Sequence, residues 1–189
     1  MDSEHGAGAM TRFMNRAIGS AILLLFLAAA APPANWREYA YPEHGFAIQF
    51  PAAPKIEKST YTAPWARELP ATTYSVEQDH ILYKMTVAEL PAGTQDGANY
   101  LGEAAYYLMR EGDVIFTDIP RIDQAQNGVF GIGMVVDAED GRRVRSSIYV
   151  TKGRLYRADA IVLPARGDKD QAIPSRFEQT LRFNLARRF

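Results

Sequence analysis

Three arginines and one tyrosine are the side chains of this chain best suited to recognising another molecule. They are Arg143, Arg145, Tyr149 and Arg157. Guanidinium groups offer paired N–H donors to a carboxylate or phosphate. The bare backbone of Gly131 and Gly133, predicted on the same sheet face, permits close approach. The group is therefore a candidate binding site for an anionic ligand or for a partner's carboxylate. In the alternative interpretation, a helix covers this face and the arginines pair with Asp137 and Asp159.

The sequence has no arrangement of residues typical of an enzyme. Histidine occurs only at His5, His44 and His80, and we expect the last two to be exposed turn residues that lack the further ligands of a metal site. Cysteine is absent, and no Gly-x-Ser-x-Gly motif presents a serine nucleophile. The glycine-rich stretch 127–133 leads into a predicted strand, whereas a phosphate-binding loop opens a helix. We therefore expect a protein that is not an enzyme and that holds no metal or cofactor.

The N-terminal region has the pattern of an export signal. A short basic stretch, Arg12–Arg16, precedes the apolar run Ala17–Ala31. As a helix this run spans roughly 22 Å, which is short for a bilayer core of about 30 Å. We predict a signal peptide over residues 1–30, with translation starting at Met10 because the residues before it are acidic. The protein is then periplasmic or secreted. Retention of the signal as a membrane anchor is the alternative.

The composition limits the classes of partner. Residues 31–189 form a chain of about 160 residues, a suitable length for a single globular domain. The 21 basic side chains nearly balance the 22 acidic ones, which argues against nucleic acid as a partner. Such a domain buries enough surface to fold without disulfides, in agreement with the absence of cysteine.

Apolar residues alternate from Val129 to Leu163, which predicts a three-stranded antiparallel meander. A three-residue loop at Glu139–Gly141 places Val136 opposite Val144, with all apolar residues on one face. The same rule at Thr151–Gly153 places the arginines together on the other face. On the apolar face this register pairs Ile148 with Tyr156 and Val144 with Ala160. On the other face it pairs Arg145 with Asp159 and Ser147 with Arg157.

The remaining pattern predicts an α+β fold with an antiparallel sheet of about six or seven strands flanked by two main helices. Further strands are expected at 45–51, 55–62, 72–76, 81–90 and 114–119, and helices at 99–111 and 170–181. In the second helix, Ile173, Phe177 and Leu181 follow the spacing of a helix face that packs on a sheet.

Several segments resemble the PsbP-like family, which includes an extrinsic subunit of photosystem II, a Ran-binding protein and exported bacterial proteins. The similar segments are Trp36 and Tyr39 before Gly45–Pro51, then Gly153–Tyr156, and the closing Phe177 and Leu181–Phe183. The resemblance implies an α/β/α sandwich over residues 31–189. It also implies a protein that binds partners and is not an enzyme. The similar positions are core aromatics, turn glycines and a strand-ending proline, so no binding residue is carried over.

Two functions follow from these observations. The first is an exported, non-catalytic binding or accessory protein that docks on another envelope protein through an exposed apolar patch. The alternative is a periplasmic small-ligand-binding protein, with a cleft between sheet and helix lined by tyrosines and one or two arginines.

Overall fold

A computed structural model describes residues 36–62, 68–94, 97–119, 121–122, 129–164 and 172–183. The backbone divides into two units, 1–32 and 33–189, and every described residue belongs to the second. The predicted signal peptide 1–30, its alternative role as an anchor and the predicted start at Met10 lie outside the described residues.

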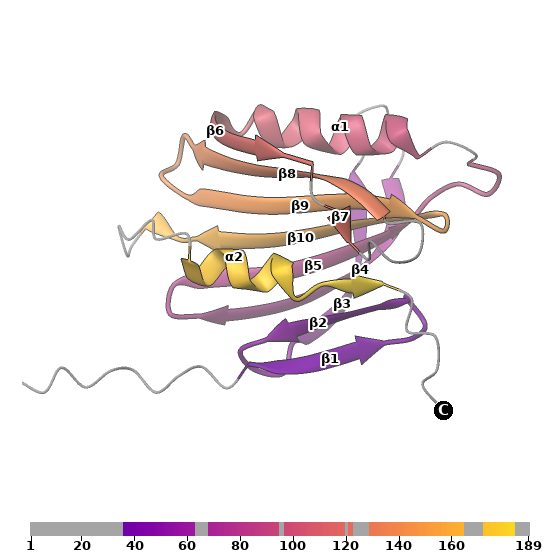
Figure 1. The fold of residues 1–189 in the computed structure, drawn as a ribbon, viewed down its shortest axis with the longest axis horizontal. Helices are drawn as coiled ribbons and strands as arrows, with labels where there is room; N and C mark the ends of the chain where they lie inside the picture. The colour runs from indigo at the N-terminus through magenta and orange to yellow at the C-terminus, as the bar shows by residue number, and fades with distance from the viewer. Residues whose placement is uncertain are drawn as a thin grey trace, which may run out of the picture. The chain divides into compact units, whose positions relative to one another are not determined.

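The described residues form an α+β fold built on one large antiparallel sheet, as predicted (Figure 1). Its strand order is β3 (Lys55–Thr62), β4 (Glu68–Gln78), β5 (Ile81–Glu89), β10 (Arg154–Val162), β9 (Arg143–Thr151), β8 (Val129–Ala138) and β6 (Gly112–Asp118). The short β7 (Arg121–Ile122) also pairs with β8. A small second sheet has the order β1 (Arg37–Tyr41), β2 (Phe46–Phe50) and β11 (Arg182–Phe183). The helices are α1 (Ala98–Met109) and α2 (Ala172–Gln179).

The large sheet has a hydrophobic core on each face. On one face, α1 buries Ala104, Ala105 and Leu108 against strands β8 and β9. On the other face, α2 and the small sheet cover a core rich in aromatic residues, in which Phe177 packs on Phe50 and Tyr83. Figure 1 shows α1 along the top of the large sheet and α2 in front of its middle strands. The described domain is therefore layered, and the predicted sandwich is confirmed.

One predicted loop is correct and the other is wrong. The loop at Glu139–Gly141 has three residues, with Gly141 at a φ of 86°, and Val136 faces Val144 as predicted. The next connection is a two-residue turn, because Lys152 and Gly153 both have positive φ, 50° and 71°. Such turns match the twist of a hairpin. The observed register slips by one residue from the predicted one. The observed pairs are Tyr149 with Tyr156, Ile148 with Arg157, Ser146 with Asp159, and Arg145 with Ala160.

The slip changes the face of every side chain in β10. Arg157 and Asp159 lie on the α1 side of the sheet, whereas Arg145 and Tyr149 lie on the α2 side. The predicted single surface of three arginines and a tyrosine therefore does not exist. Its members lie on opposite faces of the sheet.

The second helix packs on the sheet with a different set of residues from the one predicted. Phe177 and Leu181 are buried as expected, but Ile173 is exposed. Pro174 takes the inner position one helical turn before Phe177 and is buried. The apolar stripe of α2 is therefore shorter than the sequence spacing suggests.

Candidate functional site

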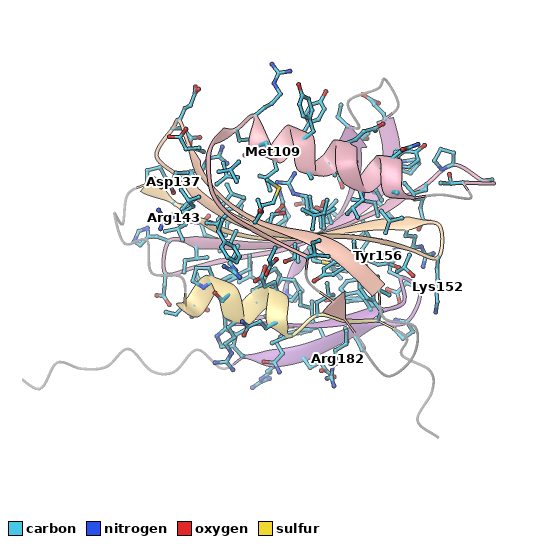
Figure 2. All side chains as sticks on the ribbon, turned by 45° about the horizontal axis from the view of Figure 1, so that its top comes forward. Met109, Asp137, Arg143, Lys152, Tyr156 and Arg182 are labelled. Carbon is cyan, nitrogen blue, oxygen red and sulfur yellow. The ribbon has the colours of Figure 1, made fainter. Side chains whose placement is uncertain are left out.

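Arg143 and Arg145 are both paired within the protein. Arg143 donates two hydrogen bonds to Asp137, from Nε at 2.6 Å and from Nη2 at 2.7 Å, as the alternative interpretation predicts (Figure 2). Arg145 Nε donates to Glu178 Oε1 of α2 at 2.6 Å, and the Ser147 hydroxyl donates to the other oxygen of that carboxylate. The predicted pairing of Arg145 with Asp159 is wrong, because the one-residue slip in register places these two side chains on opposite faces of the sheet.

Tyr149 belongs to the core. Its side chain is buried and meets Phe183 edge-on with ring centroids 5.5 Å apart. Burial raises the pKa of the Tyr149 hydroxyl. The ring lies over Gly131, the residue opposite it in β8, so the bare backbone proposed as a point of approach is filled by the protein itself.

Substitution of Gly131 by alanine tests this packing. A Cβ there would lie 2.4 Å from the Ile148 carbonyl oxygen and 2.5 Å from Tyr149 Cδ1. We expect Gly131→Ala to lower the free energy of unfolding by about 1–3 kcal/mol, as overpacking does, measured by urea denaturation. In the control, Gly102→Ala in α1, the added Cβ meets nothing within 4 Å. The control should raise stability by about 0.5–1 kcal/mol. Similar effects at both sites would contradict the close approach at Gly131.

Arg157 instead lines a polar cavity of about 250 Å³ on the α1 side of the large sheet. Strands β3, β4, β5 and β10 form its floor, and residues at the C-terminal end of α1 and just beyond it form its rim. We call this the polar cavity. Its lining residues are Ser59, Thr60, Tyr61, Thr62, Thr73, Lys84, Thr86, Tyr107, Glu111, Arg157 and Asp159.

A buried ion cluster forms part of the lining of the polar cavity. Asp159 is 0% exposed and accepts a hydrogen bond from Arg157 Nε at 2.7 Å. Its other oxygen lies 3.4 Å from Lys84 Nζ and has no hydrogen-bond partner. Burial alone would raise the pKa of Asp159, but the positive charges of Arg157 and Lys84 outweigh it and hold this pKa below its usual range. Glu111, 3.8 Å from Arg157, adds a second carboxylate at the rim.

Hydroxyl groups surround this cluster. Arg157, Thr86 and Thr73 stand opposite one another across β10, β5 and β4. Thr73 Oγ1 also lies 2.8 Å from the Ser59 hydroxyl. Two tyrosines complete the lining: Tyr61 is half-buried, and burial raises its pKa, while Tyr107 is exposed on α1. The arrangement is rich in groups that both donate and accept hydrogen bonds.

The sequence reasoning missed this cavity, although one signal pointed to it. In β10, Asp159 is flanked by Ala158, Ala160 and Ile161, and all of these residues are buried. A carboxylate inside a buried strand needs charged or hydrogen-bonding partners. The predicted register pairs Asp159 with Arg145 and so hides its true partners, Arg157 and Lys84.

An exposed apolar edge is the second feature of the described surface. Strand β6 ends the large sheet, and among the described residues no strand pairs with its outer side. Its apolar side chains and the residue that follows are between 40% and 74% exposed. They are Val114, Ile115, Phe116 and Ile119, which we call the β6 edge. The register shifts between Val114 and Phe116, so Ile115 sits in a bulge.

His44 is less exposed than predicted. Its Nδ1 forms a hydrogen bond with the Tyr74 hydroxyl, and its carbonyl oxygen accepts one from Tyr156 at 2.7 Å. Burial lowers the pKa of His44. His80 is exposed in its turn, as expected.

The described residues contain no group of three or more His, Asp or Glu side chains placed to hold a metal ion. No helix in this part of the chain is long and apolar enough to cross a membrane.

Comparison with known proteins shows the fold. No family model matches the chain, and no curated protein matches its sequence. Among solved structures, it is similar to the solution structure of cyanobacterial PsbP from Synechocystis sp. PCC 6803, with a TM-score of 0.50 at 12% sequence identity. The match covers 84% of this chain and 98% of that one. The chain has a PsbP-like fold. At this identity the likeness extends to the fold alone.

Proposed function

We propose that this protein is an exported, non-catalytic accessory protein that docks on a partner of the cell envelope through the β6 edge. The observation that supports the proposal is the exposure of apolar side chains along an edge strand. Open edges present unpaired backbone groups, and natural sheets usually protect them with charges or proline. The bulge at Ile115 and the flanking charges of Asp113 and Asp118 protect this edge only in part, because Ile115 and Phe116 remain exposed at the centre of β6. Addition of a strand from a partner covers both the backbone groups and the apolar side chains.

The charges of β6 favour a different protein over a second copy of this chain. Asp113 and Asp118 flank the apolar centre of the strand, and both are exposed. Two copies of β6 paired with each other would gather four carboxylates along one interface, and like charges on paired strands are destabilising. A partner segment with an apolar centre and basic ends matches this strand. We therefore propose an extended segment of that composition as the occupant.

Cross-linking followed by substitution tests the docking edge. A photo-reactive amino acid at position 115 should cross-link one partner in the host, and the same probe at Ile56 should not. Ile56 is a matched control, because it is 55% exposed on β3, the opposite edge of the same sheet. A synthetic peptide of the cross-linked segment should bind the wild-type protein. Ile115→Lys should weaken this binding at least about tenfold, since it loses the burial of one large aliphatic side chain. Unchanged affinity in Ile115→Lys, or equal loss in Ile56→Lys, contradicts the proposal.

A second candidate function is the binding of a small ligand in the polar cavity. The position of the cavity between the sheet and the end of α1 supports this candidate. Its lining includes two tyrosines and one arginine, Arg157. The β6 edge and the polar cavity have no residue in common, so each candidate function can be tested separately.

A further inference from the structure

We infer that the polar cavity binds a neutral, polyhydroxylated compound, of which a single sugar ring is the simplest example. This inference rests on the second candidate function, ligand binding in the cavity, and is independent of docking at the β6 edge. It names the chemical class of the ligand from the charge, the hydroxyl content and the aromatic rim of the site.

The charges of the cavity argue against an anion. Lys84 and Arg157 are its cations, and Asp159 and Glu111 are its carboxylates, so the formal charges cancel. Asp159 contacts both cations, at 2.7 Å for Arg157 and 3.4 Å for Lys84. A phosphate or carboxylate ligand would have to compete with a buried carboxylate for the same donors. A neutral ligand accepts hydrogen bonds from them without disturbing this balance.

The hydroxyl groups favour a ligand that is itself rich in hydroxyls. Five side chains on the cavity side carry a hydroxyl group, namely Ser59, Tyr61, Thr73, Thr86 and Tyr107. Thr60 and Thr62 also line the cavity, but their side chains alternate to the opposite face of β3. A side-chain hydroxyl donates one hydrogen bond and accepts others, as a sugar hydroxyl does. The row of Thr73, Thr86 and Arg157 presents two hydroxyl groups and the N–H donors of a guanidinium from three adjacent strands. This spacing allows one small ligand to contact several of them together.

The rim supplies a flat apolar surface beside these polar groups. Tyr107 is 43% exposed at the end of α1 and lines the cavity. The C–H face of a sugar ring is apolar, so an aromatic ring beside a polar floor suits its two kinds of surface. The volume of about 250 Å³ lies just below the range of roughly 300–1,000 Å³ found for drug-sized ligands. It is suited to a ligand of about one ring.

The buried ion cluster is better explained by binding than by folding. Burial of a paired arginine and aspartate rarely stabilises a protein more than apolar side chains of the same volume would. Neighbouring positions on the same sheet face, Leu155 and Ile161, are apolar and buried. The cluster therefore has a role in fixing Arg157 and Lys84 as hydrogen-bond donors in the cavity.

NMR titration of the domain with a small panel of probes tests the ligand class. The neutral probes are D-glucose, D-galactose and N-acetyl-D-glucosamine, and the anionic ones are D-glucuronate and inorganic phosphate. We expect a neutral sugar to shift backbone amides around Ser59, Thr86 and Arg157. The dissociation constant should be on the order of 1 mM, which is typical of a ligand with about twelve non-hydrogen atoms. D-Glucuronate should bind more weakly than D-glucose, because its carboxylate would have to compete with the buried carboxylate of Asp159 for the same donors.

Two neighbouring tyrosines give matched variants. Tyr107→Ala should weaken sugar binding about tenfold, a change that corresponds to a loss of one aromatic contact. Tyr106→Ala should weaken sugar binding less than Tyr107→Ala does, because Tyr106 does not line the cavity and only meets the Tyr107 ring edge-on, with centroids 6.4 Å apart. Neither exposed side chain supports the core, so both variants should fold.

The outcomes separate the ligand class from the ligand site and from docking. Binding of phosphate or D-glucuronate alone, lost in Tyr107→Ala, overturns the neutral class and leaves a ligand site in the cavity. Absence of binding by all five probes overturns the inference. Sugar binding that is lost in Tyr106→Ala but kept in Tyr107→Ala, or that shifts amides only at β6, places the site elsewhere and overturns the inference as well. Ile115→Lys should retain sugar binding, so a failure of docking at the β6 edge is recognised separately.

Discussion

Replacing Asp159 with asparagine is expected to lower the free energy of unfolding by about 3–5 kcal/mol, the usual cost of breaking a buried ion pair from one side. The substitution leaves the mostly buried guanidinium of Arg157 without its compensating charge, since Nε contacts Asp159 at 2.7 Å. Lys84 is more exposed and can turn towards solvent, so Arg157 accounts for most of the cost. Guanidinium chloride denaturation measures the difference.

Two controls separate the buried pair from a general effect of charge. Asp140→Asn removes an exposed carboxylate that contacts Arg142 at 2.6 Å, and stability should remain nearly unchanged. The double variant Arg157→Met with Asp159→Leu removes both charges and should recover most of the stability lost in Asp159→Asn. A double variant that is less stable than Asp159→Asn would contradict the view that the uncompensated charge causes the loss.

The same pair should determine part of the acid sensitivity of the domain. Because the pKa of Asp159 is lowered in the folded state from its ordinary 3.8, its ionised form stabilises the fold. This contribution is present above the unfolded pKa and is lost as the pH falls through the folded pKa. The difference between wild type and Asp159→Asn should therefore be constant near neutral pH and should narrow below about pH 4. A difference that grows on acidification would show that the pKa of Asp159 is raised.

Phe177→Ala is expected to lower the free energy of unfolding by about 3–5 kcal/mol, as large-to-small core substitutions do. Phe177 is fully buried, and its ring packs on Phe50 and Tyr83 with centroids 5.1 Å and 5.4 Å away. It joins α2, the small sheet and the large sheet in one core. Loss of its ring leaves a cavity at the point where these three layers meet.

Ile173→Ala is the matched control for Phe177→Ala. Both residues lie in α2, one turn apart, but Ile173 is exposed. Its truncation should change stability by less than about 0.5 kcal/mol. Thermal unfolding followed by circular dichroism measures both variants. Equal losses would show that Ile173 is buried in solution, as the sequence spacing originally suggested.

The sequence predicted most elements because their apolar residues alternate along the strands or recur at helical spacing. In β2 the alternation of Phe46, Ile48 and Phe50 placed the strand correctly. In β10 the alternation carries little information, because the strand is buried on both faces. The register there is determined by the turn at Lys152, where a lysine takes a positive φ that favours glycine or asparagine. A lysine gives no sign of such a turn in the sequence.

The candidate site was harder to predict than the fold. The polar cavity combines residues from four strands, from the C-terminal end of α1 and from just beyond it, and these come together only in the folded chain. The sequence points to Asp159, the most informative residue of the cavity, but the predicted register pairs it with Arg145 and not with Arg157 and Lys84. The β6 edge depends on strand order, which places β6 at the margin of the sheet. Alternation alone does not show whether a strand is central or at an edge.

The small sheet joins the two ends of the described domain. Arg182 and Phe183 pair with Ala47 and Phe46, and Phe183 also packs on Tyr156 with ring centroids 4.8 Å apart. The aromatic core on this face is therefore incomplete until β11 pairs with β2. A chain that emerges N-terminus first from a ribosome cannot complete this core until residue 183 is free. Because such long-range pairing slows folding, the aromatic core is completed only after the whole described domain has left the ribosome.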